Sequence, residues 1–178
     1  MDSKGIASSG VACNIATSKG LELEQSAPVF SKVYEAYDSK GNLKWKEETH
    51  NLVVNQGKND ILDKYFKGSA YTASWFAGLK GTGTIAAGDT LDSHGGWAEI
   101  TSYTGDRKAI TWGTVSSQSL TATAVSFAIT GTVTVAGGFI CTVATGTSGI
   151  LYSVENFSTS RSLENGDTLN VTCTVSMS

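Results

Sequence analysis

Hydrophobic and polar residues alternate along much of the chain, starting at Val29–Tyr37 (VFSKVYEAY). A period of two is typical of a β-strand with one buried face. A second segment of this kind, Leu43–His50 (LKWKEETH), follows the short connection 38–42, whose Asp and Gly residues favour a tight turn. The two segments together predict a β-hairpin.

One segment, residues 55–67 (NQGKNDILDKYFK), has a helical period instead. Asn55 is suitable as an N-cap, and Gly68 follows the last periodic residue, where a helix commonly ends. The sequence therefore predicts one short α-helix. Its apolar residues with helical spacing are Ile61, Leu62, Tyr65 and Phe66.

The second half of the chain is predicted to be almost entirely β-structure. From residue 109 onward only four residues are charged, and Thr, Ser, Val and Gly dominate, a composition that favours strands. Turn signals at 81–83 (GTG), 104–106 (TGD) and 165–167 (NGD) separate short strands, which is typical of an antiparallel sandwich or barrel. Further strands are expected at 74–79, 97–103, 108–112, 124–130, 132–145, 150–157 and 168–177.

Residues 1–27 differ from the rest, because they have little periodicity and few large apolar side chains. Such a segment buries too little surface to offset its ordering entropy by itself. We expect an N-terminal arm that is either a flexible terminus or becomes ordered against a partner subunit. The chain has 178 residues, so residues 28–178 are expected to form a single domain.

Charge and hydropathy narrow the function classes. The formal net charge is −3, with 13 Lys and Arg against 16 Asp and Glu, which disfavours general nucleic-acid binding. No apolar stretch approaches the length of a membrane helix, and residues 1–20 do not resemble a secretory signal. We therefore expect synthesis in a cytoplasm and no membrane partner.

Three cysteines, Cys13, Cys141 and Cys173, form no CxxC pair. In a reducing cytoplasm they are expected to stay thiols. Cys141 and Cys173 occupy apolar faces of predicted strands and are expected to be ordinary core residues.

The densest group of potential metal ligands is Asp89, Asp92, His94 and Glu99 in the segment AAGDTLDSHGGWAEI. Carboxylates and imidazole can bind cations, but the spacing matches neither an EF-hand nor an HExxH motif. We expect structural roles, with carboxylates capping turns and His94 bonding to the loop backbone, and we predict no metal site. Whether the four residues bind an ion stays open at this level.

No catalytic residue and no cofactor are predicted. His50 and His94 are the only histidines, and neither lies in a nucleophile motif. The Gly-rich segments 78–83 and 137–138 lack phosphate-binding patterns and indicate bends and bulges. Trp45, Trp75, Trp97 and Trp112 are expected mostly in the core, with a sugar platform or a subunit contact as the alternative.

Two regions, residues 49–112 and 137–175, resemble a group of small virion structural proteins of tailed bacteriophages. The N-terminal arm departs most from that resemblance. The residues that carry the resemblance are 49–53 (THNLV), Gly57, 60–66 (DILDKYF), 75–79 (WFAGL), 87–91 (AGDTL), 93–99 (SHGGWAE), Tyr103, Arg107, 138–140 (GFI), 149–153 (GILYS), Phe157, Arg161 and 166–172 (GDTLNVT).

The resemblance implies a non-enzymatic β-sandwich, jelly-roll-like, on the virion exterior. Within the group, the small size and the absence of a repetitive shaft sequence favour a capsid decoration (cement) protein. Its expected partners are the major capsid protein and further copies of itself in a homotrimer. The alternative is a tail-associated fibre, knob or receptor-binding module that recognises cell-surface glycans.

Overall fold

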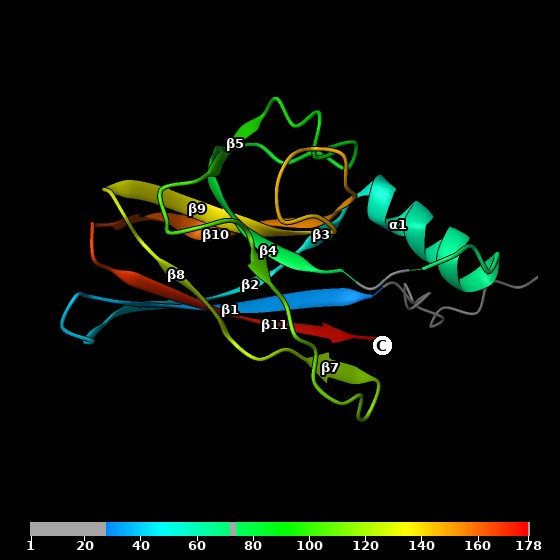
Figure 1. Ribbon diagram of the computed structural model, residues 1–178, viewed down its shortest axis with the longest axis horizontal. Helices are drawn as coiled ribbons and strands as arrows, with labels where there is room; N and C mark the ends of the chain where they lie inside the picture. Colours follow the sequence, from blue (N-terminus) through cyan, green and yellow to red (C-terminus); the bar gives the residue numbers. More distant parts are fainter. Residues whose placement is uncertain (1–27, 72–73, 178) are drawn as a thin grey trace, which may run out of the picture.

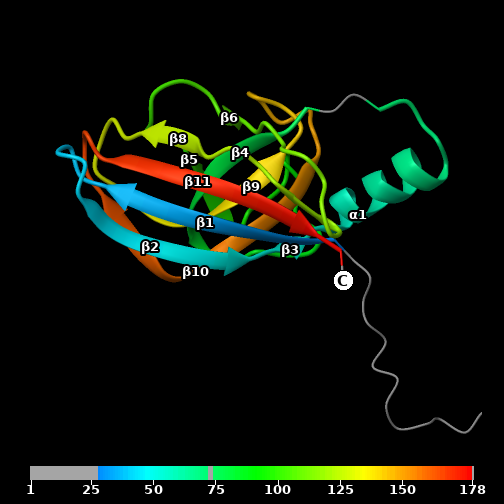
Figure 2. The same ribbon diagram turned by 90° about the horizontal axis from the view of Figure 1, so that it is seen from below.

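The computed structural model describes residues 28–71 and 74–177, which form a mainly β structure built from two antiparallel sheets (Figure 1). The predicted fold class is confirmed at this level, and the two sheets have a sandwich-like arrangement (Figure 2). The predicted arm, residues 1–27, lies outside the described residues.

The first sheet has the order β2-β1-β11-β7, with β8 also paired to β11. Its strands are β1 (Val29–Tyr37), β2 (Leu43–His50), β7 (Ser119–Thr121), β8 (Val125–Ala128) and β11 (Thr168–Ser176). The second sheet has the order β3-β10-β9-β4-β5, with β6 also paired to β4. Its strands are β3 (Leu52–Val53), β4 (Phe76–Gly83), β5 (Trp97–Ile100), β6 (Lys108–Ala109), β9 (Val133–Cys141) and β10 (Leu151–Leu163).

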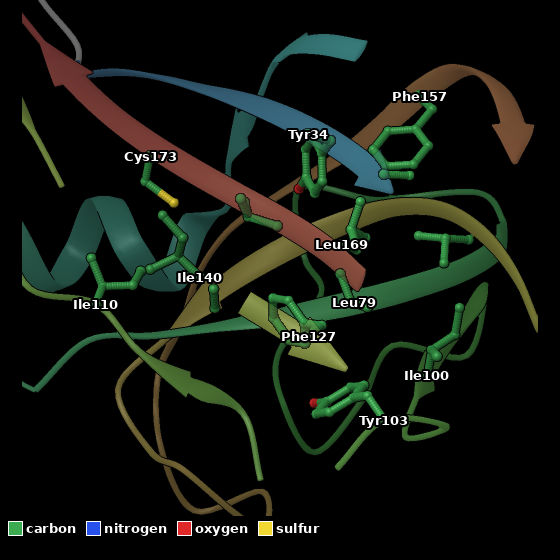
Figure 3. Close-up of a cluster of buried hydrophobic side chains, with 14 of the residues drawn as sticks. Tyr34, Leu79, Ile100, Tyr103, Ile110, Phe127, Ile140, Phe157, Leu169 and Cys173 are labelled. Atoms are coloured by element: carbon green, nitrogen blue, oxygen red, sulfur yellow. The ribbon is translucent and has the colours of Figure 1, made fainter. Parts of the chain in front are cut away.

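The main core lies between the sheets and takes large apolar side chains from both (Figure 3). Phe127 and Leu169 of the first sheet and Leu79 and Ile140 of the second are completely buried. Each such side chain contributes about 1.5–3 kcal/mol by burial. This shared core is the principal force that holds the two sheets together.

The predicted hairpin is confirmed, with both strands at the predicted bounds. Its turn is fixed by Asp38, whose carboxylate accepts hydrogen bonds from the backbone N–H groups of Lys40 (2.9 Å) and Asn42 (2.8 Å). Gly41 has a φ of 84°, a conformation that favours glycine. The turn residues thus determine the register of β1 and β2.

The helical segment consists of α1 (Asn55–Ile61), which continues as a π-helical turn, η1 (Leu62–Phe66). Gly68 ends it with a φ of 77°, as expected. The prediction of Asn55 as N-cap was wrong, because Val54 occupies the cap position and Asn55 is already helical. The backbone N–H of Asn55 donates instead to the carbonyl of Ala87 (2.8 Å). A loop residue therefore satisfies one of the backbone N–H groups that have no partner within the helix.

Two strands extend beyond their predicted ends. β10 runs to Leu163, six residues past the predicted end, with an irregular register against β9 between Asn156 and Arg161. β4 includes residues 81–83, so the predicted turn there was wrong. Gly83 has a φ of 124° and no Cβ, so the end of β4 can lie in close contact with the backbone of Gly96.

Other predicted strands are shorter in the structure. Residues 101–103 and 110–112 lie outside β5 and β6, and Tyr103 and Trp112 form only isolated bridges, to Ile129 and Ala122. The short strands β3 and β7 were not predicted. The turns at 104–106 and 165–167 are confirmed by Gly105 and Gly166, which have φ values of 76° and 91°.

Candidate functional site

A groove of about 730 Å³ lies at the end of the molecule from which the helix projects (Figure 1). The helical segment lines it together with residues of β1, β7, β10 and β11. Most of the lining is apolar, with an unusual share of aromatic rings. These rings belong to Phe30, Tyr65, Phe66, Tyr71, Trp75, Trp112 and Tyr152.

The second part of the helical segment, η1, presents its apolar side chains to solvent. Leu62, Tyr65 and Phe66 are 58%, 80% and 73% exposed, and η1 has no buried residue. The Tyr65 and Phe66 rings meet edge to face, with centroids 5.1 Å apart. A contiguous exposed apolar patch of this kind marks an interaction surface in most proteins.

The floor of the groove consists of aromatic rings that pack against one another. Tyr152 of β10 packs edge to face against Phe30 of β1 (5.6 Å) and against Trp75 (4.7 Å). The indole N–H of Trp75 donates to the hydroxyl of Tyr71 (3.0 Å). Edge-to-face contacts of this type add to the stabilisation from burial, so they help to hold the rings of the floor together.

Few charged groups line the groove. Asp60 and Lys64 are its only charged residues within the described part of the chain. Burial raises the pKa of Tyr152 far above its usual range, so its hydroxyl keeps its proton and can only act as a neutral hydrogen-bonding group. This chemistry suits the binding of apolar side chains by burial.

A second recess, at the opposite end, is smaller and more polar. It has a volume of about 380 Å³ and is lined by the β1–β2 turn and the start of β11, including Tyr37, Asp38 and Asn170. Turn residues dominate it, and the carboxylate of Asp38 is already engaged by its own turn.

The four possible metal ligands are engaged by other groups of the protein, and two of them, Asp89 and His94, share Trp97 as a partner. Asp89 accepts hydrogen bonds from the Trp97 indole and the Ala86 backbone (both 2.9 Å), which confirms its predicted role in a turn. Nδ1 of His94 lies 3.0 Å from the carbonyl of Trp97, so the predicted backbone bond is confirmed, and its ring stacks on that indole.

The other two carboxylates bind elsewhere. Asp92 accepts from the hydroxyl of Thr147 (3.0 Å), and Glu99 forms a two-pronged ion pair with Arg107 (2.8 and 2.7 Å). Among residues 28–71 and 74–177, no three His, Cys, Asp or Glu side chains are arranged to hold a metal ion.

The predicted core cysteines are confirmed for Cys141 and Cys173, which are 0% and 1% exposed. Cys173 points into the core between the sheets (Figure 3). Burial raises the pKa of Cys141 and raises that of Cys173 to about 11, so neither forms a reactive thiolate near neutral pH. Cys13 lies outside the described residues.

The tryptophans divide between core and groove. Trp97 is buried, as predicted, and Trp45 packs against the core. Trp75 and Trp112 also contact the core, but both line the groove. The prediction of core packing is thus confirmed in part, and the alternative of a sugar platform or a subunit contact stays a prediction for Trp75 and Trp112.

Sequence reasoning missed a buried polar cluster between the sheets. The Lys32 ammonium of β1 lies 2.7 and 2.5 Å from the two carboxyl oxygens of Glu155 in β10, and the hydroxyl of Tyr34 donates to the same carboxyl group. The signal was present, because Lys32 falls between Phe30 and Tyr34 on the inward face of β1.

Comparisons with known proteins identify no relative: no protein family and no curated protein sequence matches the chain. In the described residues, no helix has the length and apolar character required to cross a membrane.

Proposed function

We propose that this protein decorates the exterior of a bacteriophage head and stabilises the capsid through protein–protein contacts. The observation that carries the proposal is the aromatic groove beside an exposed apolar helix. The resemblance of residues 49–112 and 137–175 to virion structural proteins also supports it. The proposal includes a jelly-roll-like arrangement of the two sheets.

The groove is proposed to receive an apolar segment of the major capsid protein. Exposed apolar surface contributes roughly 25 cal/mol per Å² when a partner covers it. Phe66 and Tyr65 are mostly exposed in the isolated chain, so they have much of this surface still to bury. Many such contacts around a closed shell add by multivalency, so each one can be weak.

Self-association into a homotrimer is part of the same proposal. A trimer on a threefold position would present three grooves to the shell at once. This role requires no catalysis and no cofactor, only a rigid body with a defined contact surface.

One observation favours the alternative of a tail-associated fibre, knob or receptor-binding module. Trp75 and Trp112 line the groove, and indole rings are suitable platforms for the apolar faces of sugars. Glycan recognition also needs converging hydrogen-bonding groups, and the groove has few. We therefore place head decoration first.

The test uses heads of the encoding virus prepared without this protein. Purified protein is added, and cosedimentation and the temperature of DNA release are measured. We expect binding and a higher release temperature. Phe66→Glu, which puts a charge on the exposed helix, should abolish both effects. Leu43→Glu is the matched control, because Leu43 is also exposed (54%) but lies in β2, outside the groove.

Absence of binding by the unmodified protein would reject head decoration. Binding that Phe66→Glu leaves intact would keep the head location but reject the groove as the contact. Binding to host-surface glycans, together with only a few copies per virion, would instead establish the tail-associated alternative.

A further inference from the structure

The starting observation is the geometry of Lys32 and Glu155. Both oxygens of the Glu155 carboxyl group lie within 2.7 Å of Lys32 Nζ. The carboxyl carbon bonded to both oxygens is then at most about 3 Å from the nitrogen, close enough for attack once Nζ lies over the face of the carboxyl group. The two side chains are 1% and 0% exposed, so bulk water does not reach them.

Burial favours the uncharged form of Glu155. Burial raises the pKa of Glu155, and the neighbouring groups that face it are Tyr34, Lys80 and Cys173. Lys80 directs its ammonium elsewhere, to Asn156 Oδ1 (2.7 Å) and the carbonyls of Gly81 and Gly83. Proton transfer from Lys32 to Glu155 within the pair yields a neutral amine beside a neutral carboxylic acid, which removes two buried charges.

We propose that Lys32 and Glu155 condense to form an amide bond that joins the two sheets. The lone pair of Nζ attacks the carboxyl carbon, forming the N–C bond. The C–O bond to one carboxyl oxygen then breaks, and that oxygen leaves with two protons as water. The ammonium and carboxylate become an amide and one water molecule, so atoms and charge balance without a co-reactant.

The fold supplies both the driving force and a means of activation. Groups held in contact react with effective concentrations of roughly 10⁵–10⁸ M, which outweighs the unfavourable condensation of free amines and acids in water. The Tyr34 hydroxyl donates to Oε1 of Glu155 and polarises the carbonyl under attack. Burial also hinders the reverse reaction, because the reaction water leaves and bulk water does not enter.

The bond would connect β1 of one sheet with β10 of the other across the core. Each sheet would then be covalently tied to its partner, and separation of the sheets would require breaking a covalent bond. This inference does not depend on the proposed function, since it concerns only the interior of the folded chain.

The first test is the intact mass of the full chain under denaturing conditions, after incubation of the folded protein at neutral pH. We expect a mass lower than that of the unlinked chain by one water molecule. The matched control is Lys32→Arg, which retains the positive charge but has no amine to form this amide, and which should keep the full mass.

Tryptic digestion locates the bond even if the variant fails to fold. An unlinked chain gives the separate peptides 20–32, 33–40 and 109–161. An amide at Lys32 blocks cleavage after that residue, so the expected product is 20–40 joined to 109–161. A full intact mass with a free peptide 20–32 would overturn the proposal. Loss of one ammonia instead of one water would also overturn it, because it would indicate a Lys80–Asn156 bond.

Discussion

Individual polar side chains at the margin of the core join the two sheets. Glu47 of β2 accepts hydrogen bonds from the backbone N–H of Ser158 (2.8 Å) and from its hydroxyl (2.6 Å). It also accepts from the Arg161 guanidinium (2.9 Å). Ser158 and Arg161 belong to β10, so this single carboxylate links strands of both sheets. Hydrogen bonds to a charged group contribute more than neutral ones.

We expect Glu47→Gln to lower the free energy of unfolding by about 1–3 kcal/mol at neutral pH. The Ser158 hydroxyl, followed by Arg161, lowers the pKa of Glu47 in the folded state. The stabilisation that the charged Glu47 carboxylate provides is therefore complete above the pKa of this group in the unfolded chain, near 4.5. It is lost as the pH falls through the lower pKa that the group has in the folded state. Urea unfolding at several pH values should show a weaker acid dependence for the variant.

The neighbouring Glu48→Gln is the control for this charge change, because Glu48 is exposed. It should alter stability by less than about 0.5 kcal/mol. An equal effect of both substitutions would show that general charge, rather than the cross-sheet contact, controls acid stability.

Gly138 is a second residue with a specific steric role. It lies inside β9, where an added Cβ would be 2.2 Å from the Tyr34 hydroxyl oxygen and 3.1 Å from a carboxyl oxygen of Glu155. We expect Gly138→Ala to destabilise the fold by about 1–3 kcal/mol in thermal or urea unfolding. Gly88→Ala, at an open position, should change stability by less than about 0.5 kcal/mol. If Gly138→Ala is neutral, the packing of the buried cluster is looser than described.

At the scale of elements, the helix approaches the second sheet through a glycine. Gly57 is the buried residue of α1, and a Cβ there would lie 2.5 Å from the carbonyl oxygen of Tyr152 in β10. The Gln56 side chain accepts a hydrogen bond from the backbone N–H of Leu151 (2.9 Å) beside this contact. Close backbone contact and one side-chain bond therefore position the wall of the groove.

Gly57→Ala is expected to destabilise the protein by about 1–3 kcal/mol, because the helix must move away from β10. An isolated helix would gain about 0.5–1 kcal/mol from the same change, so the sign is diagnostic. Asn59→Ala, on an exposed helix position, should be neutral or slightly stabilising. Thermal unfolding of both variants checks this, and a stabilised Gly57→Ala would contradict the close contact.

Elements with a strong local signal could be predicted from the sequence, and the others could not. The hairpin 29–50 was predictable because alternation and turn chemistry agree within one short segment. The extension of β10 to Leu163 was not, because residues 158–162 are polar and their pairing depends on the distant strand β9. The helical segment was predicted, but its N-cap, its π-helical second part and the exposure of Tyr65 and Phe66 were not. No local pattern distinguishes a face that packs within the chain from one left free.

At the scale of the whole molecule, the two ends differ in chemistry. Figure 2 shows the helix at one end and the β1–β2 turn at the other. The aromatic groove lies beside the helix, and the polar recess lies beside the turn. The apolar surface is therefore concentrated on one end. A molecule of this kind is expected to attach in one orientation.

An apolar fluorescent dye such as anilinonaphthalene sulfonate should bind the folded protein mainly at the groove. We expect Phe66→Ser to remove most of the fluorescence gain while unfolding stays within about 0.5 kcal/mol of the unmodified chain, since Phe66 contributes little to the core. Leu43→Ser, outside the groove, should leave the fluorescence unchanged. Equal loss in both variants would indicate non-specific dye adsorption.

The position of β1 has a mechanical consequence. The strand begins beside the groove, runs to the far hairpin, and is paired with β11 from Val29 through Tyr37 and with β2 on its other side. A tension applied at residue 28 along the strand axis loads both rows of hydrogen bonds in shear, so many bonds share the force instead of breaking one after another. A load entering at the groove end is thus distributed over the length of the first sheet.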